Sequence, residues 1–302
     1  MIREIAHVRH IRMLYLQLLY HCNFACQHCF HGELLKAEDS YSEQEVGAML
    51  RYFRTNYGLA AVTLLGGEPL LHPGIVEVCR EAKALGLAVE ICTNGHFGFQ
   101  HQVEKLAPYL DKLRISLEGL QPANDRIRHP GSFVAAMRTI EAAHRLDIPL
   151  GATMTVTATN LHDVVPLARL LEQRGVQELK LHCLRPVGNA TQHPELFITD
   201  TARYTALHEA IRHANLGIEL RYDADLAPHP HSDACATNGN RAGQDLDRIE
   251  ADPRGGLTMS CKAVGRHAHA FRWDSSQETV VYEPHAHDEL IQHIPDVVYR
   301  ST

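Results

Sequence analysis

The chain has 302 residues, 45% of them apolar, and a formal net charge of −7. This length fits one large barrel domain, or a barrel with a small appendage, and the apolar fraction is that of an ordinary globular protein. The acidic balance argues against a nucleic-acid partner and permits a cationic ligand, and no run approaches the ~18 apolar residues of a membrane span.

The N-terminal residues 1–11 hold no apolar core followed by a small-residue cleavage site, which argues against a signal peptide. Eight cysteines fit a reducing cytoplasm better than a disulfide framework. We therefore expect a cytoplasmic protein without a membrane partner.

Three cysteines follow the apolar stretch Met13–Tyr20 closely, at Cys22, Cys26 and Cys29. From one loop they can supply three thiolates to a [4Fe–4S] cube and leave its fourth iron open to a small molecule. A structural zinc ion would need a fourth ligand, which His28 or His31 could provide. The spacing alone leaves both interpretations open.

Strand and helix patterns then alternate along the chain. Strands are predicted at Met13–Tyr20, Ala60–Leu65, Leu87–Cys92, Lys112–Leu117, Pro149–Val156 and Val176–Leu184. Helices are predicted at Ser42–Tyr57, Pro73–Leu85, Gln100–Leu110, Ser132–Leu146 and Leu161–Arg174. Repeats of this kind predict parallel strands with right-handed crossovers. Their number suits an open α/β fold, a partial (β/α)6 TIM-like barrel, with functional groups at the carboxyl ends of the strands.

The sequence pattern changes after Pro186. A helix is predicted at Thr199–Asn215 and a strand at Ile218–Tyr222. A polar loop is expected over Asp223–Asp247, and a hairpin over Arg248–Cys261 that turns at Asp-Pro-Arg-Gly-Gly. We expect residues 1–186 to form the barrel and residues 187–302 a small C-terminal extension that covers the barrel mouth.

The cysteine loop and four later segments together resemble the radical S-adenosylmethionine (radical SAM) enzymes. These segments are Gly66-Gly67-Glu68-Pro69, Thr93-Asn94-Gly95, Ile115-Ser116-Leu117-Glu118-Gly119, and Pro253-Arg254-Gly255-Gly256 before Ser260-Cys261. The last is similar to an element of the cysteine-rich SPASM/twitch extensions, here in reduced form. The resemblance implies a [4Fe–4S] cluster on Cys22, Cys26 and Cys29, S-adenosylmethionine on its open iron, and an external electron donor such as flavodoxin or ferredoxin.

The resemblance also implies the residues that bind S-adenosylmethionine. Gly66 and Gly67 would bring backbone groups to the methionyl amino group, and His28 stands where the family usually has an aromatic residue beside the adenine. The strand-end acid Glu118 replaces the commoner aspartate. The full set of expected cofactor-binding residues is His28, Gly66, Gly67, Glu68, Asn94, Ser116, Glu118 and Arg128.

The later cysteines Cys183, Cys235 and Cys261 are too few for two auxiliary clusters. Cys183 and Cys235 are expected as ligands if a second iron–sulfur cluster exists. Cys261 is interpreted as a hydrogen-atom donor to a substrate radical, with a cluster ligand as its alternative role. The layout is similar to the neomycin C epimerase type, which implies a cationic aminoglycoside substrate and inversion of a sugar carbon.

Asp223 and Asp225 could pair with ammonium groups of such a substrate, although a solvated acidic loop explains them equally simply. Three other interpretations stay open. They are a maturase or epimerase of ribosomally made peptides, a sugar dehydrogenase with a second cluster, and a zinc-stabilised binding module.

Overall fold

The computed structural model describes residues 8–96, 100–223, 226, 245–258 and 271–282. These residues belong to two compact units: unit 1 comprises residues 1–22, 34–91 and 237–302, and unit 2 residues 23–33 and 92–236. Both units alternate parallel strands with helices, which confirms the predicted α/β class of a partial (β/α)6 barrel with a small C-terminal extension.

Unit 1 contains the first three strands, β1 (His10–Gln17), β2 (Ala61–Leu65) and β3 (Ala88–Thr93), whose last two residues belong to unit 2. They are parallel, with Leu14 opposite Val62 and Val62 opposite Val89. All three side chains are fully buried, so the apolar runs that predicted the strands form the core of this unit.

Helix α1 (Glu43–Tyr57) connects β1 to β2, and α2 (Ile75–Ala84) connects β2 to β3. The predicted capping box is confirmed at the start of α1. The Ser42 hydroxyl accepts from the Glu45 amide at 3.2 Å, and the Ser42 amide donates to Glu45 Oε2 at 2.7 Å. A cap of this kind stabilises a helix by about 1 kcal/mol, because it satisfies donors that have no partner inside the helix.

The C-terminal strands extend the sheet of unit 1 from the other edge of β1. Strand β8 (Asp245–Ala251) pairs with β1 in parallel, followed by β9 (Gly256–Thr258), β10 (Phe271–Asp274) and β11 (Thr279–Tyr282) in antiparallel order. The predicted hairpin turn is confirmed, since the Asp252 amide donates to Gly256 O at 2.9 Å. Strand β8 begins at Asp245, inside the segment that was expected to be a loop, because the edge of β1 supplies hydrogen-bond partners for its backbone.

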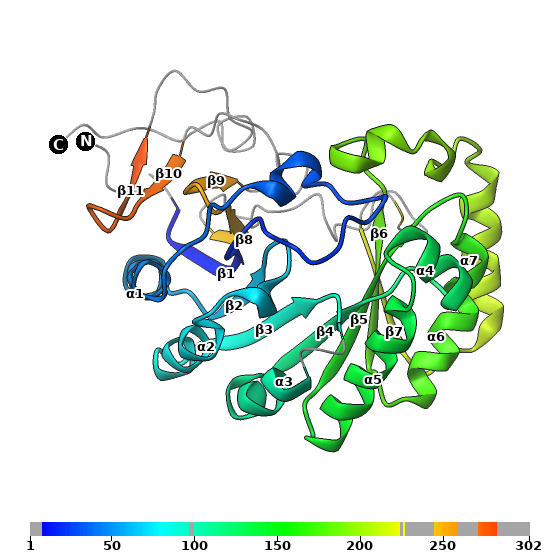
Figure 1. The fold of residues 1–302 in the computed structure, drawn as a ribbon, viewed down its shortest axis with the longest axis horizontal. Helices are drawn as coiled ribbons and strands as arrows, with labels where there is room; N and C mark the ends of the chain where they lie inside the picture. The colour runs from blue at the N-terminus through cyan, green and yellow to red at the C-terminus, as the bar shows by residue number, and fades with distance from the viewer. Residues whose placement is uncertain (1–7, 97–99, 224–225, 227–244, 259–270, 283–302) are drawn as a thin grey trace. The chain divides into compact units, whose positions relative to one another are not determined.

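Unit 2 contains the parallel strands β4 (Lys112–Ser116), β5 (Leu150–Val156), β6 (Glu178–Cys183) and β7 (Glu219–Tyr222). Figure 1 shows these strands side by side, with helices α5 and α6 along them. The helices of the unit are α3 (Gln100–Leu106), α4 (Gln121–Ile127), α5 (Ser132–Arg145), α6 (Val164–Gln173) and α7 (Ala202–Ala214). Among them, α4 was not predicted from the sequence.

The register of unit 2 separates its sheet into two faces, because register partners on neighbouring strands point to the same side. One face is apolar and fully buried, with Ala152 opposite Ile115 and Leu179. The other face, called the polar face below, has Thr153 opposite Ser116 and Lys180, and Thr155 opposite His182. Its polar members on these three strands include Arg114, Ser116, Thr153, Thr155, Glu178, Lys180 and His182.

A buried carboxylate joins the amino ends of the unit 2 strands. Glu178, 2% exposed, lies 2.5 Å from Arg114 Nη2, 3.0 Å from Lys112 Nζ and 3.2 Å from Arg221 Nε. Burial disfavours its ionised form, but Arg114 and Lys112 outweigh burial and hold the pKa of Glu178 below its usual value.

Short 3-10 turns complete the fold, and they occupy Gly32–Lys36, Pro69–Leu71, Ala107–Tyr109, Leu161–Asp163, Gly188–Gln192 and Pro194–Leu196. Within the described ranges, no helix combines the length and the apolar character that crossing a membrane would require.

Candidate functional site

Two of the three loop cysteines, Cys26 and Cys29, lie in unit 2, and Cys22 ends the first segment of unit 1. The Cys29 amide donates to Cys26 O at 3.1 Å, and the Cys26 side chain is buried. Burial raises the pKa of the Cys26 thiol to about 11, although the Arg128 guanidinium opposes the shift. Without a metal the thiol form is therefore favoured, and binding of iron must displace its proton.

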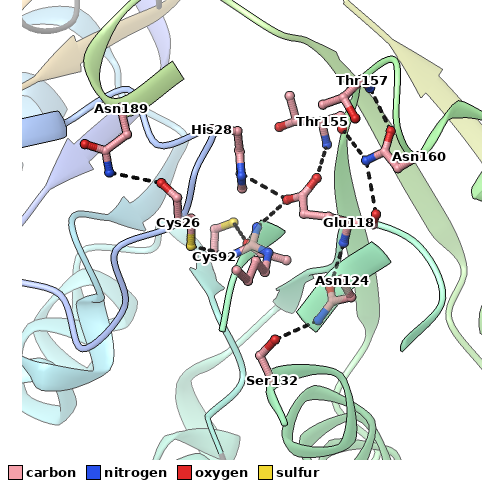
Figure 2. Close-up of polar contacts among 12 residues, drawn as sticks. Cys26, His28, Cys92, Glu118, Asn124, Ser132, Thr155, Thr157, Asn160 and Asn189 are labelled. Atoms are coloured by element: carbon pink, nitrogen blue, oxygen red, sulfur yellow. Dashed lines mark hydrogen bonds and ion pairs between the residues drawn. The ribbon is translucent and has the colours of Figure 1, made fainter. Parts of the chain in front are cut away.

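The turn at Gly188–Gln192 holds this cysteine loop by its carbonyl oxygens. The Asn189 side-chain amide donates to Cys26 O at 3.0 Å (Figure 2). The Asn189 backbone amide donates to Cys29 O at 2.8 Å. Gly188 has a φ of +59°, and a Cβ at this position would lie 2.4 Å from Cys29 O. Only glycine allows so close an approach in this conformation.

The Gly66-Gly67-Glu68 segment in unit 1 lies against the residues that precede Cys22. The Gly67 amide donates to Leu19 O at 2.7 Å, and the Glu68 amide donates to His21 O at 3.0 Å. A Cβ on Gly67 would lie 2.1 Å from Tyr20 O, which explains the glycine. The buried Glu68 side chain accepts from the Leu70 amide at 3.0 Å and caps the turn that follows.

Glu118, 1% exposed, is the centre of a charged group in unit 2. Its carboxylate lies 3.1 Å from His28 Nε2, accepts from Arg128 Nη2 at 2.5 Å and accepts from the Thr155 amide at 2.7 Å. Figure 2 shows His28 and Thr155 reaching this carboxylate from different sides. Burial alone would raise the pKa of Glu118, but His28 and Arg128 lower it to about 2.

Two asparagines hold the backbone of Glu118, and neither was predicted from the sequence. Asn124 Oδ1 accepts from the Glu118 amide at 2.8 Å, and Asn160 Nδ2 donates to Glu118 O at 3.0 Å. Both side chains are completely buried. Asn160 lies 42 residues after Glu118 in the sequence, so no local pattern could have identified this contact.

Two buried nitrogen atoms beside Glu118 lack a hydrogen-bond partner among the described residues: His28 Nδ1 and Arg128 Nε. Arg128 Nη1 also lies 3.9 Å from Cys26 Sγ. Folded proteins pair nearly all buried polar groups, so orphaned atoms of this kind point to a missing partner. Thiol donors with unpaired polar groups beside them fit the expected cluster and its sulfonium ligand, whose amino and carboxylate groups need such partners.

Ser116 and Asn94 have hydrogen-bond partners other than Glu118. The Ser116 hydroxyl lies 3.7 Å from Cys92 Sγ, and Asn94 Nδ2 donates to Asn23 Oδ1 at 2.8 Å, one residue after Cys22. Their expected contacts with S-adenosylmethionine stay predictions. No three His, Cys, Asp or Glu side chains of the described ranges converge as ligands of one metal ion.

Cys183 lies at the end of β6, and its amide donates to Asp223 Oδ2 at 3.2 Å. Asp223, 5% exposed, also contacts His182 Nδ1, so its carboxylate is already engaged by the chain's own groups. Cys235, Cys261 and Asp225 lie outside the described residues, and the predicted roles of the cysteines as cluster ligands or hydrogen donor remain predictions.

Comparison with known proteins places these residues in a wider context. The model of the Radical SAM superfamily matches residues 16–171, a range that contains the cysteine loop, Gly66–Glu68 and the Glu118 group. An AdoMet-dependent heme synthase of Methanosarcina barkeri (strain Fusaro / DSM 804) is 29% identical over 229 residues, which are 72% of this chain and 62% of that protein.

A second relative is the sporulation killing factor maturation protein SkfB of Bacillus subtilis (strain 168), 28% identical over 59% of this chain and 43% of that protein. This chain therefore spans about half the length of the curated relatives it matches. Among solved structures, Streptococcus suis SuiB bound to its precursor peptide SuiA has a TM-score of 0.71 at 15% identity, over 95% of this chain and 65% of that one. SuiB has also been crystallised with S-adenosylmethionine.

Proposed function

Since the chain belongs to the radical SAM superfamily, with a [4Fe–4S] cluster and S-adenosylmethionine as its cofactors, we propose that it modifies a peptide by radical chemistry. When bound, the cofactors supply an electron that cleaves the sulfonium C–S bond and a 5′-deoxyadenosyl radical that removes a hydrogen atom from the substrate. The reductant is an external donor of the flavodoxin or ferredoxin class.

In this proposal Cys22, Cys26 and Cys29 hold the cluster. Asn189 fixes the carbonyl groups of Cys26 and Cys29, so these two thiols keep their positions when their protons leave. The Arg128 guanidinium beside Cys26 favours the thiolate form that iron requires.

The buried group around Glu118 is the observation that carries the cofactor assignment. Glu118 fixes one nitrogen of His28 and one of Arg128, and leaves His28 Nδ1 and Arg128 Nε unpaired. Arg128 would bind the methionyl carboxylate, since guanidinium–carboxylate pairs are strong when water is excluded. His28 would lie against the adenine, and Gly66, Gly67 and Glu68 would meet the methionyl amino group.

A peptide substrate is supported by the relatives and by the charge of the polar face. SkfB is a maturation protein, and SuiB binds the precursor peptide SuiA. On the polar face, Lys180 makes no ion pair with a described residue, and Asp223 is buried against His182. This distribution of charge suits a substrate with neutral amide groups better than a polycation.

The aminoglycoside epimerase hypothesis remains a second proposal that rests on Cys261 as hydrogen donor. Neomycin C and the anaerobic enzyme in D2O provide its test. Deuterium at an inverted carbon, lost in Cys261→Ala while S-adenosylmethionine cleavage continues, would favour it over a peptide substrate. A sugar dehydrogenase with a second cluster would instead bind about eight irons per chain.

The central proposal is tested by anaerobic reconstitution with iron and sulfide, followed by addition of S-adenosylmethionine and dithionite. We expect about four irons per chain, absorption near 400 nm and formation of 5′-deoxyadenosine. Cys26→Ala should lose all three properties. The matched control Cys79→Ala, which changes a buried thiol in α2, should keep them. A colourless wild-type chain that binds one zinc ion would overturn the proposal.

A further inference from the structure

Two side chains of β6, Lys180 and His182, lie on the polar face and have no role in the cofactor site. His182 Nδ1 lies 3.1 Å and 3.2 Å from the two carboxylate oxygens of Asp223. An ionised carboxylate only accepts hydrogen bonds, so Nδ1 carries the ring proton and Nε2 of the neutral ring is an acceptor. Asp223 therefore fixes both the orientation and the tautomer of His182.

The acceptor atom of His182 is available to a ligand. The His182 side chain is 34% exposed, and Nε2 has no hydrogen-bond partner within the described residues. The pair thus presents one oriented imidazole nitrogen to the space above the polar face.

Two further unpaired groups lie beside it. Lys180 precedes His182 by two residues on the same face, is half-buried, and forms no ion pair in the described part of the chain, although its charge interacts with the Asp223 carboxylate at longer range. Its register partner Thr153 is 8% exposed, and Thr153 Oγ1 is buried without a hydrogen-bond partner. Buried hydroxyl groups are normally paired, so this one indicates an absent ligand.

This cluster adjoins the cofactor site within unit 2. His182 is the register partner of Thr155, whose amide donates to the Glu118 carboxylate at 2.7 Å. Neighbouring strands lie about 4.8 Å apart, so the imidazole lies one strand from the residue that holds Glu118. A ligand bound here would present its bonds close to the expected S-adenosylmethionine.

We propose that Lys180, His182 and Thr153 form the polar anchor for a peptide backbone, an inference that rests on the proposed function. His182 Nε2 accepts a hydrogen bond from a peptide N–H, and Lys180 Nζ donates to a peptide carbonyl. Residues two apart on a strand are separated by about 7 Å, which matches the repeat of N–H and C=O groups along an extended chain. The Thr153 hydroxyl takes a third backbone group, and the positive charge of Lys180 disfavours a polycationic sugar.

The test uses the reconstituted enzyme under anaerobic conditions, with S-adenosylmethionine and without reductant. A library of N-acetylated, C-amidated hexapeptides is equilibrated with the wild-type chain, and retained peptides are identified by mass spectrometry after ultrafiltration. We expect a defined subset to be retained. Both His182→Ala and Lys180→Met should retain that subset at least tenfold less, and His182→Gln, which keeps an acceptor, should recover part of the loss.

His213→Ala on α7 and Lys105→Met on α3 are the matched controls, since both residues are exposed and lie outside the site. Equal S-adenosylmethionine affinity in all chains shows that the variants are folded. Retention of the same peptides within twofold by both variants overturns the anchor, as does a wild-type chain that retains neomycin C but no peptide. Formation of 5′-deoxyadenosine by the wild-type chain tests the radical chemistry of the proposed function separately, so a failure of that chemistry is distinguishable from a failure of the anchor.

Discussion

Two buried glutamates of unit 2, Glu118 and Glu178, have the same chemistry and different consequences. Glu178 begins β6 at the amino end of the sheet, and its partners are three long cations from strands β4 and β7. Glu118 follows β4 at the carboxyl end, and its partners are His28, Arg128 and the Thr155 amide. Both carboxylates are held ionised against the cost of burial.

The two groups differ in the number of buried nitrogen atoms that have no hydrogen-bond partner. At Glu118, two buried nitrogen atoms remain unpaired, whereas no nitrogen of Lys112, Arg114 or Arg221 is among the buried unpaired atoms. The backbone of Glu118 is also fixed by two buried asparagines, which keeps the carboxylate in place without using those nitrogens. The Glu118 group therefore has donors available for a ligand, whereas the donors around Glu178 serve to stabilise the fold.

The largest expected effect follows from neutralising the carboxylate at the cofactor site. Glu118→Gln removes the charge that holds His28 and Arg128 in the positions where they would meet S-adenosylmethionine. Breaking a buried ion pair of this kind also typically costs about 3–5 kcal/mol of stability. We expect affinity for S-adenosylmethionine, measured by anaerobic calorimetry on the reconstituted enzyme, to fall at least a hundredfold. A variant that binds within threefold of wild type would contradict the cofactor assignment.

The same substitution at the other glutamate should separate stability from binding. Glu178→Gln should lower the free energy of unfolding by about 3 kcal/mol, because Arg114 loses its buried partner. Urea denaturation measures this change, and S-adenosylmethionine affinity should stay within twofold of wild type. If both variants weakened cofactor binding equally, the two sites would not differ as proposed.

Acid should act on Glu118 in a predictable direction. Its folded pKa of about 2 lies below the usual value of about 4.3, so its contribution to stability is fully present above the unfolded value and is lost as the pH falls toward 2. The difference in unfolding free energy between wild type and Glu118→Gln, measured on the cluster-free chain, should shrink by up to about 3 kcal/mol between pH 6 and pH 2. If the difference in unfolding free energy did not change with pH, the pKa of Glu118 would not be lowered in the folded state.

The smallest effect concerns the support of the cysteine loop. Asn189→Ala removes one hydrogen bond to Cys26 O, which contributes roughly 1 kcal/mol. We expect iron to be lost to a chelator several-fold faster than from wild type. Gln192→Ala, an exposed substitution in the same 3-10 turn, is the control and should leave the rate unchanged. Equal rates of iron loss in both variants would show that Asn189 does not stabilise the cysteine loop.

Much of the fold was predictable because its signals are local. The apolar runs of β1 to β6 and the capping box of α1 appear within a few residues of sequence. Helix α4 has seven residues with a proline near its start and too few turns for a visible period. Strand β8 was partly assigned to a loop, because its partner β1 lies more than 200 residues away and no local pattern records that pairing.

Part of the candidate site could likewise be predicted from the sequence, and part could not. The motif resemblance identified His28, Glu118 and Arg128 as candidates, and the structure joins them in one charged group. The same resemblance could not distinguish Asp223 as a ligand of ammonium groups from Asp223 as the partner of His182. That distinction depends on burial and on the register of β6 and β7, which only the tertiary structure supplies.

Electron paramagnetic resonance of the dithionite-reduced enzyme tests the central claim most directly. If Cys22, Cys26 and Cys29 hold a [4Fe–4S] cluster with one open iron, the reduced cluster will give a signal whose g values shift when S-adenosylmethionine is added. Cys26→Ala will give no such signal. A wild-type spectrum that is identical with and without S-adenosylmethionine would contradict the account.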